Sequence, residues 1–168
     1  MDTWVDDILS VKAEHLGTSG AGSGWFATMT LGWQDSSGGS LGSSAMTALF
    51  NSVKVFWDEG NDGYGNGTDT CIATITTFGS VTDSGTMTID LPKGTSTRLW
   101  PAGNPDGPAT KTYTVVVDMK SNASSQLPET LVVTISESGP NGSPTGVRYK
   151  EWETNTDMFM SGTDTVSA

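Results

Sequence analysis

The sequence predicts an all-β fold, an immunoglobulin-like sandwich of two antiparallel sheets with about eight strands and little or no helix. Short runs of β-branched and aromatic residues alternate apolar and polar side chains along the chain. Clusters of Gly, Asn, Asp, Ser and Pro separate these runs, and helical periodicity is almost absent. A closed β-barrel is the alternative architecture for the same pattern.

The clearest two-residue period of the first half lies at 25–34 (WFATMTLGWQ). Its apolar members are expected to share one face, with Trp33 in the core: Trp25, Ala27, Met29, Leu31 and Trp33. Further strands are expected over 8–14 and 52–57, and a turn of helix at 45–51 is expected to lead into the second of these.

The second half shows the same alternation. Strands are expected at 70–78, 86–91, 110–120 and 130–138, and edge strands at 147–152 and near 157–162. The segment 92–110 holds four of the seven prolines and is expected to be a long loop without regular structure.

Composition limits the classes of function. A chain of 168 residues fits a single domain, 1–168, with 1–7 and 163–168 as flexible or exchangeable termini. The net charge of −11 argues against binding to nucleic acid or anionic membranes. No apolar run is long enough to cross a membrane. The N-terminus lacks the basic and apolar regions of a signal peptide, so the chain is either cytosolic or exported through a signal upstream of Met1. We expect the second case, with an extracellular or cell-surface location.

The segment 58–69 (DEGNDGYGNGTD) separates the strands at 52–57 and 70–78, and its glycines exclude both strand and helix. Its crowded carboxylates repel one another in the absence of a cation: Asp58, Glu59, Asp62 and Asp69. A hard divalent cation with oxygen ligands, calcium above all, would remove this repulsion. The alternative is a solvated hairpin loop that binds nothing. The neighbouring Cys71 lies inside a strand pattern and is expected to be a buried, inert thiol.

The spacing within 58–69 partly matches the twelve-residue calcium loop that connects two helices. Gly63 stands at the sixth position, but Gly60 at the third has no side-chain oxygen, and the flanks are strands. We expect carboxylate ligands from Asp58, Asp62 and Asp69. Asn61 or Asn66 and the carbonyl of Tyr64 are expected to complete the shell.

The chain also resembles a sandwich module that recurs in large exported bacterial surface proteins. The matching stretches are the strand from Val53 to Trp57, the acidic loop of D-x-N-x-D-G type, the "DTCIA" strand from Asp69, and "TYTVVVD" ending at Asp118. The likeness spans about residues 25–138. It implies a structural or adhesive building block of the cell surface, whose partners are neighbouring domains or subunits of a surface assembly.

Catalysis has little support in the residues. His15 is the single histidine and has no placed partner for a nucleophile–base pair, and no hydrolase or phosphate-binding motif occurs. We therefore expect a protein that is not an enzyme.

Two other binding functions remain open. Six tryptophans are many for this length, and exposed Trp binds sugar rings, so a carbohydrate-binding module is one alternative. Trp100 in the Pro-rich segment is its candidate ligand platform, although anchoring of the loop is the commoner role of such a residue. A filament subunit assembled through sheet edges or a donated strand is the other alternative.

Overall fold

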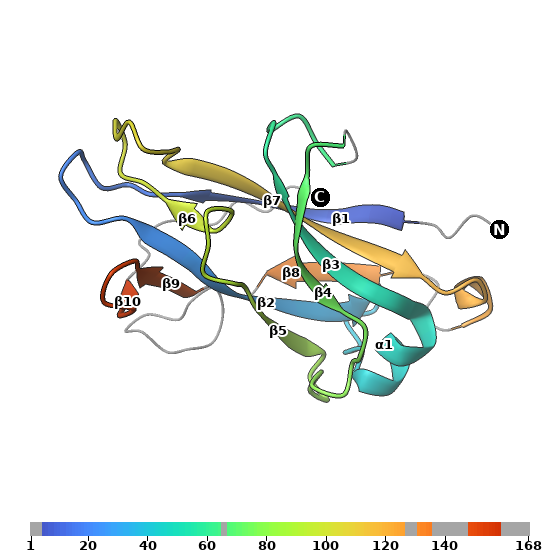
Figure 1. The fold of residues 1–168 in the computed structure, drawn as a ribbon. Helices are drawn as coiled ribbons and strands as arrows, with labels where there is room; N and C mark the ends of the chain where they lie inside the picture. Colours follow the sequence, from blue (N-terminus) through green and yellow to red (C-terminus); the bar gives the residue numbers. More distant parts are fainter. Residues whose placement is uncertain (1–4, 65–66, 127–130, 136–147, 159–168) are drawn as a thin grey trace.

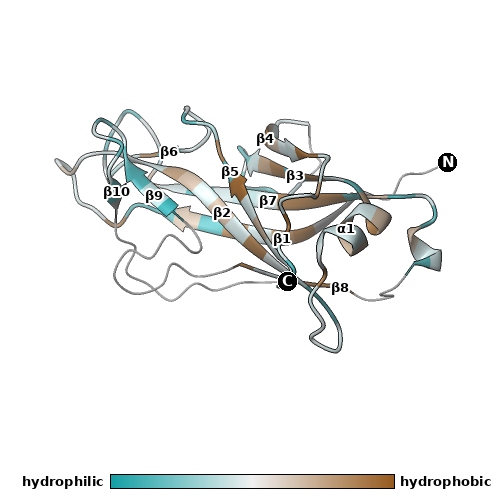
Figure 2. Cartoon of the chain, turned by 90° about the horizontal axis from the view of Figure 1, so that it is seen from below, coloured by the Kyte–Doolittle hydropathy of each residue, from teal (hydrophilic) through white to brown (hydrophobic). Residues whose placement is uncertain are grey.

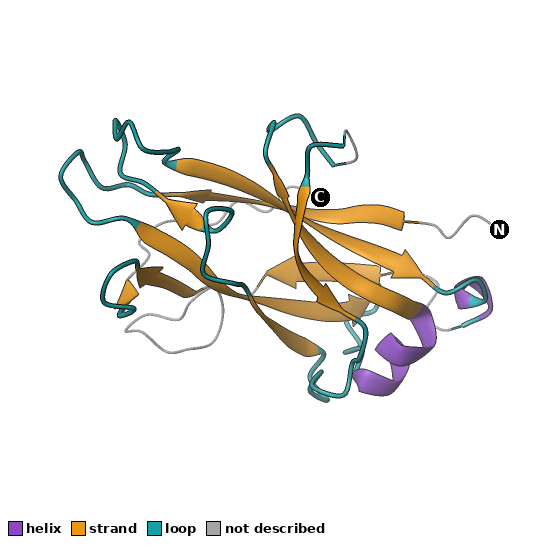
Figure 3. Cartoon of the chain, viewed as in Figure 1, coloured by secondary structure: helices purple, strands orange, loops and turns teal. Residues whose placement is uncertain are grey.

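The computed structural model describes residues 5–64, 67–126, 131–135 and 148–158, with two antiparallel sheets packed face to face (Figure 1). The predicted two-sheet, all-β sandwich is therefore confirmed. Figure 3 shows that helix is confined to short segments at one end of the molecule.

The first sheet has four strands in the order β1-β7-β3-β4. Its members are β1 (Val5–Glu14), β7 (Thr110–Met119), β3 (Phe50–Asp58) and β4 (Thr70–Ile75). β7 pairs with β1 on one side and β3 on the other, and β3 pairs in turn with β4. The N-terminal residues 5–7, predicted to be exchangeable, are paired with β7. Residues 1–4 and 163–168 lie outside the described residues.

The second sheet is built around β2 (Gly24–Asp35) and has six strands. On one side β2 pairs with β5 (Thr86–Asp90) and β6 (Arg98–Leu99). On the other side it pairs with β8 (Leu131–Ile135) and β9 (Arg148–Glu151), and β9 pairs with β10 (Asp157–Met158). The twelve residues of β2 thus organise this sheet.

The core lies between the sheets and contains the inward residues of β3, β5 and β7, as the alternation predicted. Figure 2 shows the apolar character of these strands and the hydrophilic character of β9 and β10. Aromatic rings connect the sheets: Phe26 of β2 lies 4.9 Å from Tyr113 of β7 and 5.6 Å from Tyr149 of β9 between ring centroids. Burial raises the pKa of both tyrosines, because the phenolate would lose its hydration.

The predicted face of β2 is wrong for Trp25. Met29, Leu31 and Trp33 belong to the core cluster, as predicted. At the start of the strand, however, Phe26 and not Trp25 belongs to this cluster. The pairing of β2 with β9 shifts register between Phe26 and Thr28, and this bulge changes the phase of the alternation. Trp25 consequently pairs with Arg98 and Lys150 on the opposite face of the sheet, where it is still buried, with 9% of the residue exposed.

The other differences are local. The predicted helical turn is present as α1 (Ser43–Leu49), and its buried residues are Met46 and Leu49. Regular structure was not expected in the segment 92–110, but the segment contains β6. This strand forms because Leu99 is fully buried and pairs with Gly24. Cys71 is exposed, so the expectation of a buried thiol is wrong. A short 3-10 helix, Ala123–Ser125, follows β7.

Candidate metal centre

The acidic segment connects β3 to β4 and projects from the upper edge of the molecule in Figure 1. The hairpin pairs Trp57 with Thr70 and Val53 with Ile75, so the loop begins and ends at adjacent strand ends. Asp58, the last residue of β3, also pairs with Thr112 of β7. The first predicted ligand is therefore positioned by the sheet.

The carboxylate of Asp58 organises the start of the loop. Only 5% of the residue is exposed. Its Oδ1 accepts a hydrogen bond from the Asp62 backbone N–H (3.2 Å), and its Oδ2 accepts one from that of Gly63 (3.1 Å). These bonds offset part of the cost of burying a charged group, and they fold the chain back towards β3.

Three of the predicted ligands meet at this place. One carboxylate oxygen each from Asp58, Asp62 and Asp69 lies within 4.8 Å of the other two. Two oxygens bound to the same Ca²⁺ ion are at most about 5 Å apart, because each Ca–O distance is about 2.3–2.6 Å. The spacing therefore fits a shared hard cation, and without one the three negative charges repel.

Glycine is required beside this cluster. A Cβ atom on Gly60 would stand 2.6 Å from Oδ1 of Asp62. Gly63 has a φ of +92°, a left-handed conformation that glycine adopts without strain. Gly60, which supplies no ligand oxygen at the third position, thus leaves room for the carboxylate of Asp62.

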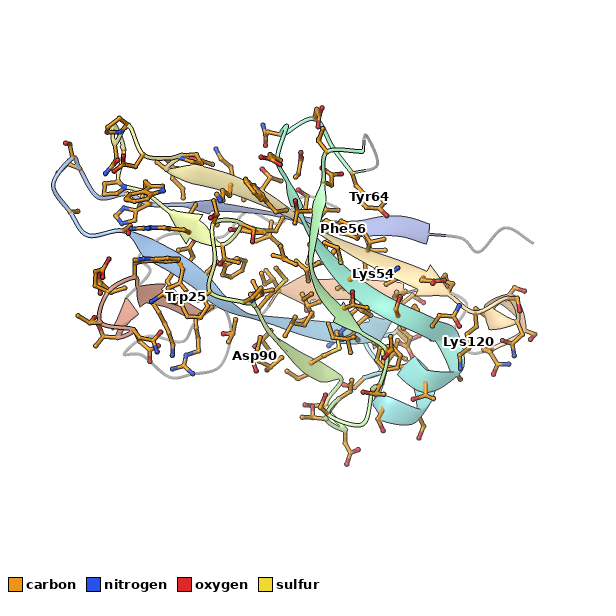
Figure 4. All side chains as sticks on the ribbon, viewed as in Figure 1. Trp25, Lys54, Phe56, Tyr64, Asp90 and Lys120 are labelled. Carbon is orange, nitrogen blue, oxygen red and sulfur yellow. The ribbon has the colours of Figure 1, made fainter. Side chains whose placement is uncertain are left out.

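The remaining predicted ligands are Asn61, the carbonyl of Tyr64, and Asn66. Oδ1 of Asn61 accepts a hydrogen bond from Oγ1 of Thr112 at 2.6 Å, so its amide contacts β7. The ring of Tyr64 packs edge-on against Phe56, with centroids 4.9 Å apart; Figure 4 labels both residues. Asn66 lies outside the described residues.

Sequence reasoning missed a cation close to the loop. Lys111 is buried, its Nζ lies 3.8 Å from the ring centroid of Trp57, and it donates a hydrogen bond to the Thr95 carbonyl. Burial lowers its pKa to about 8, while the Glu59 carboxylate acts in the opposite direction. The inward alternation of Tyr113 and Val115 on β7, extended back by one step, identifies Lys111 as inward-facing.

The structure places Trp100 directly after β6, half-buried in a stack of side chains. The Cζ atom of Arg98 lies 3.6 Å from its ring centroid. Gly107 lies so close to the ring that a Cβ atom there would be 2.2 Å from Cδ1. The backbone N–H of Trp100 donates to the Pro108 carbonyl at 3.0 Å. Trp100 therefore fixes the 100–108 loop to the end of the sandwich.

Comparison with known proteins gives no relative. No protein-family model, no curated protein and no solved structure matches this chain. Among the described residues, no helix has the length and apolar character needed to cross a membrane.

Proposed function

We propose that this chain is a non-enzymatic structural module in which the β3–β4 loop binds a divalent cation, with calcium the best fit. The observation that carries the proposal is the convergence of Asp58, Asp62 and Asp69 within 4.8 Å. Carboxylate oxygens are the ligands that calcium prefers, and the larger calcium ion tolerates irregular geometry.

The position of the loop gives the ion its role. Asp58 is part of the pairing of β3 with β7, whereas Asp69 immediately precedes β4. A cation shared by these carboxylates would link both ends of the loop and stiffen the hairpin. The expected effect is on folding stability, because a ligand that binds only the folded state shifts the unfolding equilibrium.

The wider context is part of the proposal. An exported, acidic sandwich with a cation-stiffened loop suits a cell-surface structural or adhesion module that contacts neighbouring domains or subunits. The low charged fraction, 16%, and the high Ser, Thr and Gly content support an extracellular setting. The resemblance to bacterial surface modules points the same way.

Titration calorimetry with CaCl₂ and, separately, MgCl₂ tests the site. We expect one calcium site per chain and weaker magnesium binding, because Mg²⁺ requires strict octahedral geometry and dehydrates reluctantly. Asp62→Asn should abolish the calcium signal, and Asp106→Asn, which changes an exposed aspartate outside the cluster, should preserve it. Absence of calcium binding at millimolar concentration, or equal loss in both variants, contradicts the proposal.

A further inference from the structure

Cationic and indole side chains gather at the end of the sandwich formed by β2, β6 and β9, away from the acidic loop. Four of the chain's eight basic residues belong to this region, and three of its six tryptophans accompany them. The residues are Lys93, Arg98, Arg148 and Lys150, with Trp25, Trp100 and Trp152. Such a concentration of positive charge is unexpected in a chain of net charge −11.

The strand register explains how these residues meet. Trp25 pairs directly with Arg98 on one side and with Lys150 on the other, so the three side chains form a row across three strands on the outer face. Directly opposed side chains in a sheet have Cβ atoms about 5 Å apart. Figure 4 shows Trp25 at this end of the second sheet.

A stack of cations and rings continues the row. The guanidinium of Arg98 lies 3.6 Å from the ring centroid of Trp100 and 4.2 Å from that of Trp152. Nζ of Lys93 lies 4.7 Å from the Trp152 ring and donates a hydrogen bond to the Trp152 carbonyl. Nε and Nη2 of Arg98 both donate to Oγ of Ser23. These contacts hold the cations in place, which lowers the entropic cost of binding a ligand.

The nearby carboxylates neutralise only part of this group. Asp157 is paired with Arg148 at 2.6 Å, and Glu151 accepts hydrogen bonds from the backbone and side chain of Thr154. Among the described residues, no carboxylate lies within salt-bridge distance of Arg98, Lys93 or Lys150. Asp157 is nevertheless opposite Lys150 in the β9–β10 pair. Hydrogen bonds from Thr154 lower the pKa of Glu151, and the charge of Lys93 adds to this shift. Lys93 is exposed and the other two are half-buried.

We propose that Lys93, Arg98 and Lys150, with the half-buried Trp100 and Trp152, bind a carboxylate-bearing polysaccharide. The cations would attract its carboxylates, and the exposed parts of the indole rings would add apolar contact with its sugar rings. The acidic remainder of the molecule repels a polyanion, so binding is confined to this end and weakens with salt. This site is separate from the proposed cation loop.

Binding of sodium polygalacturonate, measured by calorimetry in EDTA, tests the inference, because the chelator removes any bridging by metal at the acidic loop. The same polymer with its carboxylates methyl-esterified is the neutral control. We expect binding to the acidic form only, and an affinity that falls as NaCl is raised. Lys150→Glu should weaken binding at least about tenfold. Lys12→Glu, the same charge change at an exposed site on β1, should alter it less than about twofold.

Arg98→Gln should also weaken binding, and a folded sandwich in its circular dichroism spectrum is the check on its integrity. Equal binding of the esterified polymer, equal losses in Lys150→Glu and Lys12→Glu, or no binding at all overturns the inference. Tighter binding of poly-glutamate than of polygalacturonate also overturns it, because the partner would then be an acidic peptide.

Discussion

Thr112 of β7 donates a hydrogen bond from Oγ1 to Oδ1 of Asn61 at 2.6 Å, and this bond ties the acidic loop to a strand outside its own hairpin. Asn61 has a φ of 52°, a left-handed conformation that is uncommon outside glycine. The bond therefore holds the loop in a shape that its backbone alone does not favour, next to the three clustered carboxylates.

Thr112→Val tests this contact, because valine keeps the shape of threonine and removes the hydroxyl. We expect the free energy of unfolding to fall by about 0.5–1.5 kcal/mol and calcium affinity to fall with it. Urea unfolding and calcium titration measure the two effects. Thr110→Val on the same strand is the control, and equal changes in both variants would show that the bond has no special role.

Substitutions of Asp58 and Asp62 should differ in their effect on stability when calcium is absent. Asp58→Asn leaves a single side-chain oxygen for two backbone N–H groups, so we expect a loss of about 1–3 kcal/mol in chelator. Asp62→Asn removes one of three like charges, so its stability in chelator should be unchanged or slightly higher. Urea unfolding of both variants in EDTA gives the comparison. Equal destabilisation by the two changes would contradict the assigned roles.

The lowered pKa of Lys111 predicts how the free energy of unfolding depends on pH. Burial lowers its pKa from 10.5 to about 8, so between these values the unfolded chain binds more protons than the folded one. Stability contributed by this residue should therefore rise from pH 8 to pH 10. We expect wild type to gain about 1–2 kcal/mol relative to Lys111→Met over this range.

Urea unfolding at each pH measures the difference between the two proteins. Tyr113 and Tyr149 change the free energy of unfolding in the opposite direction as the pH rises, because their raised pKa values make the unfolded chain ionise first. Both proteins contain these tyrosines, so their contribution cancels in the comparison. Parallel pH curves for wild type and Lys111→Met would show that Lys111 does not titrate as described.

Gly85→Ala should destabilise the turn before β5. Gly85 has a φ of +72°, and a Cβ atom there would stand 2.4 Å from the carbonyl oxygen of Trp33. We expect a loss of about 2–3 kcal/mol, because both the backbone conformation and the close approach require glycine. Gly79→Ala, where a Cβ atom meets nothing within 4 Å, should change stability little. Denaturant unfolding that ranks the two variants equally would contradict this assignment.

Much of the sandwich could be predicted because inward residues alternate strictly in the strong strands, as Val53 and Val55 do in β3. The face on which Trp25 lies could not be predicted. The bulge that changes its side of the sheet depends on pairing with β9, which is more than a hundred residues away in the chain. Strand β6 was missed because two residues give no periodic signal, and only the pairing with Gly24 and Trp25 defines it.

The candidate site was partly predictable for the same reason. Asp58, Asp62 and Asp69 are close in sequence, so a single loop brings them together. The orientation of Asn61 depends on a hydrogen bond from Thr112, which lies far from Asn61 in the sequence, on β7. Local spacing contains no information about such a partner.

Thermal unfolding with and without calcium tests the central claim most directly. At calcium concentrations about a hundred times the dissociation constant, stability should rise by about 2.7 kcal/mol, equivalent to roughly 5–10 °C in Tm for a domain of this size. The rise should vanish in Asp62→Asn and persist in Asp106→Asn. Identical melting of wild type in calcium and in chelator would contradict a structural cation at the β3–β4 loop.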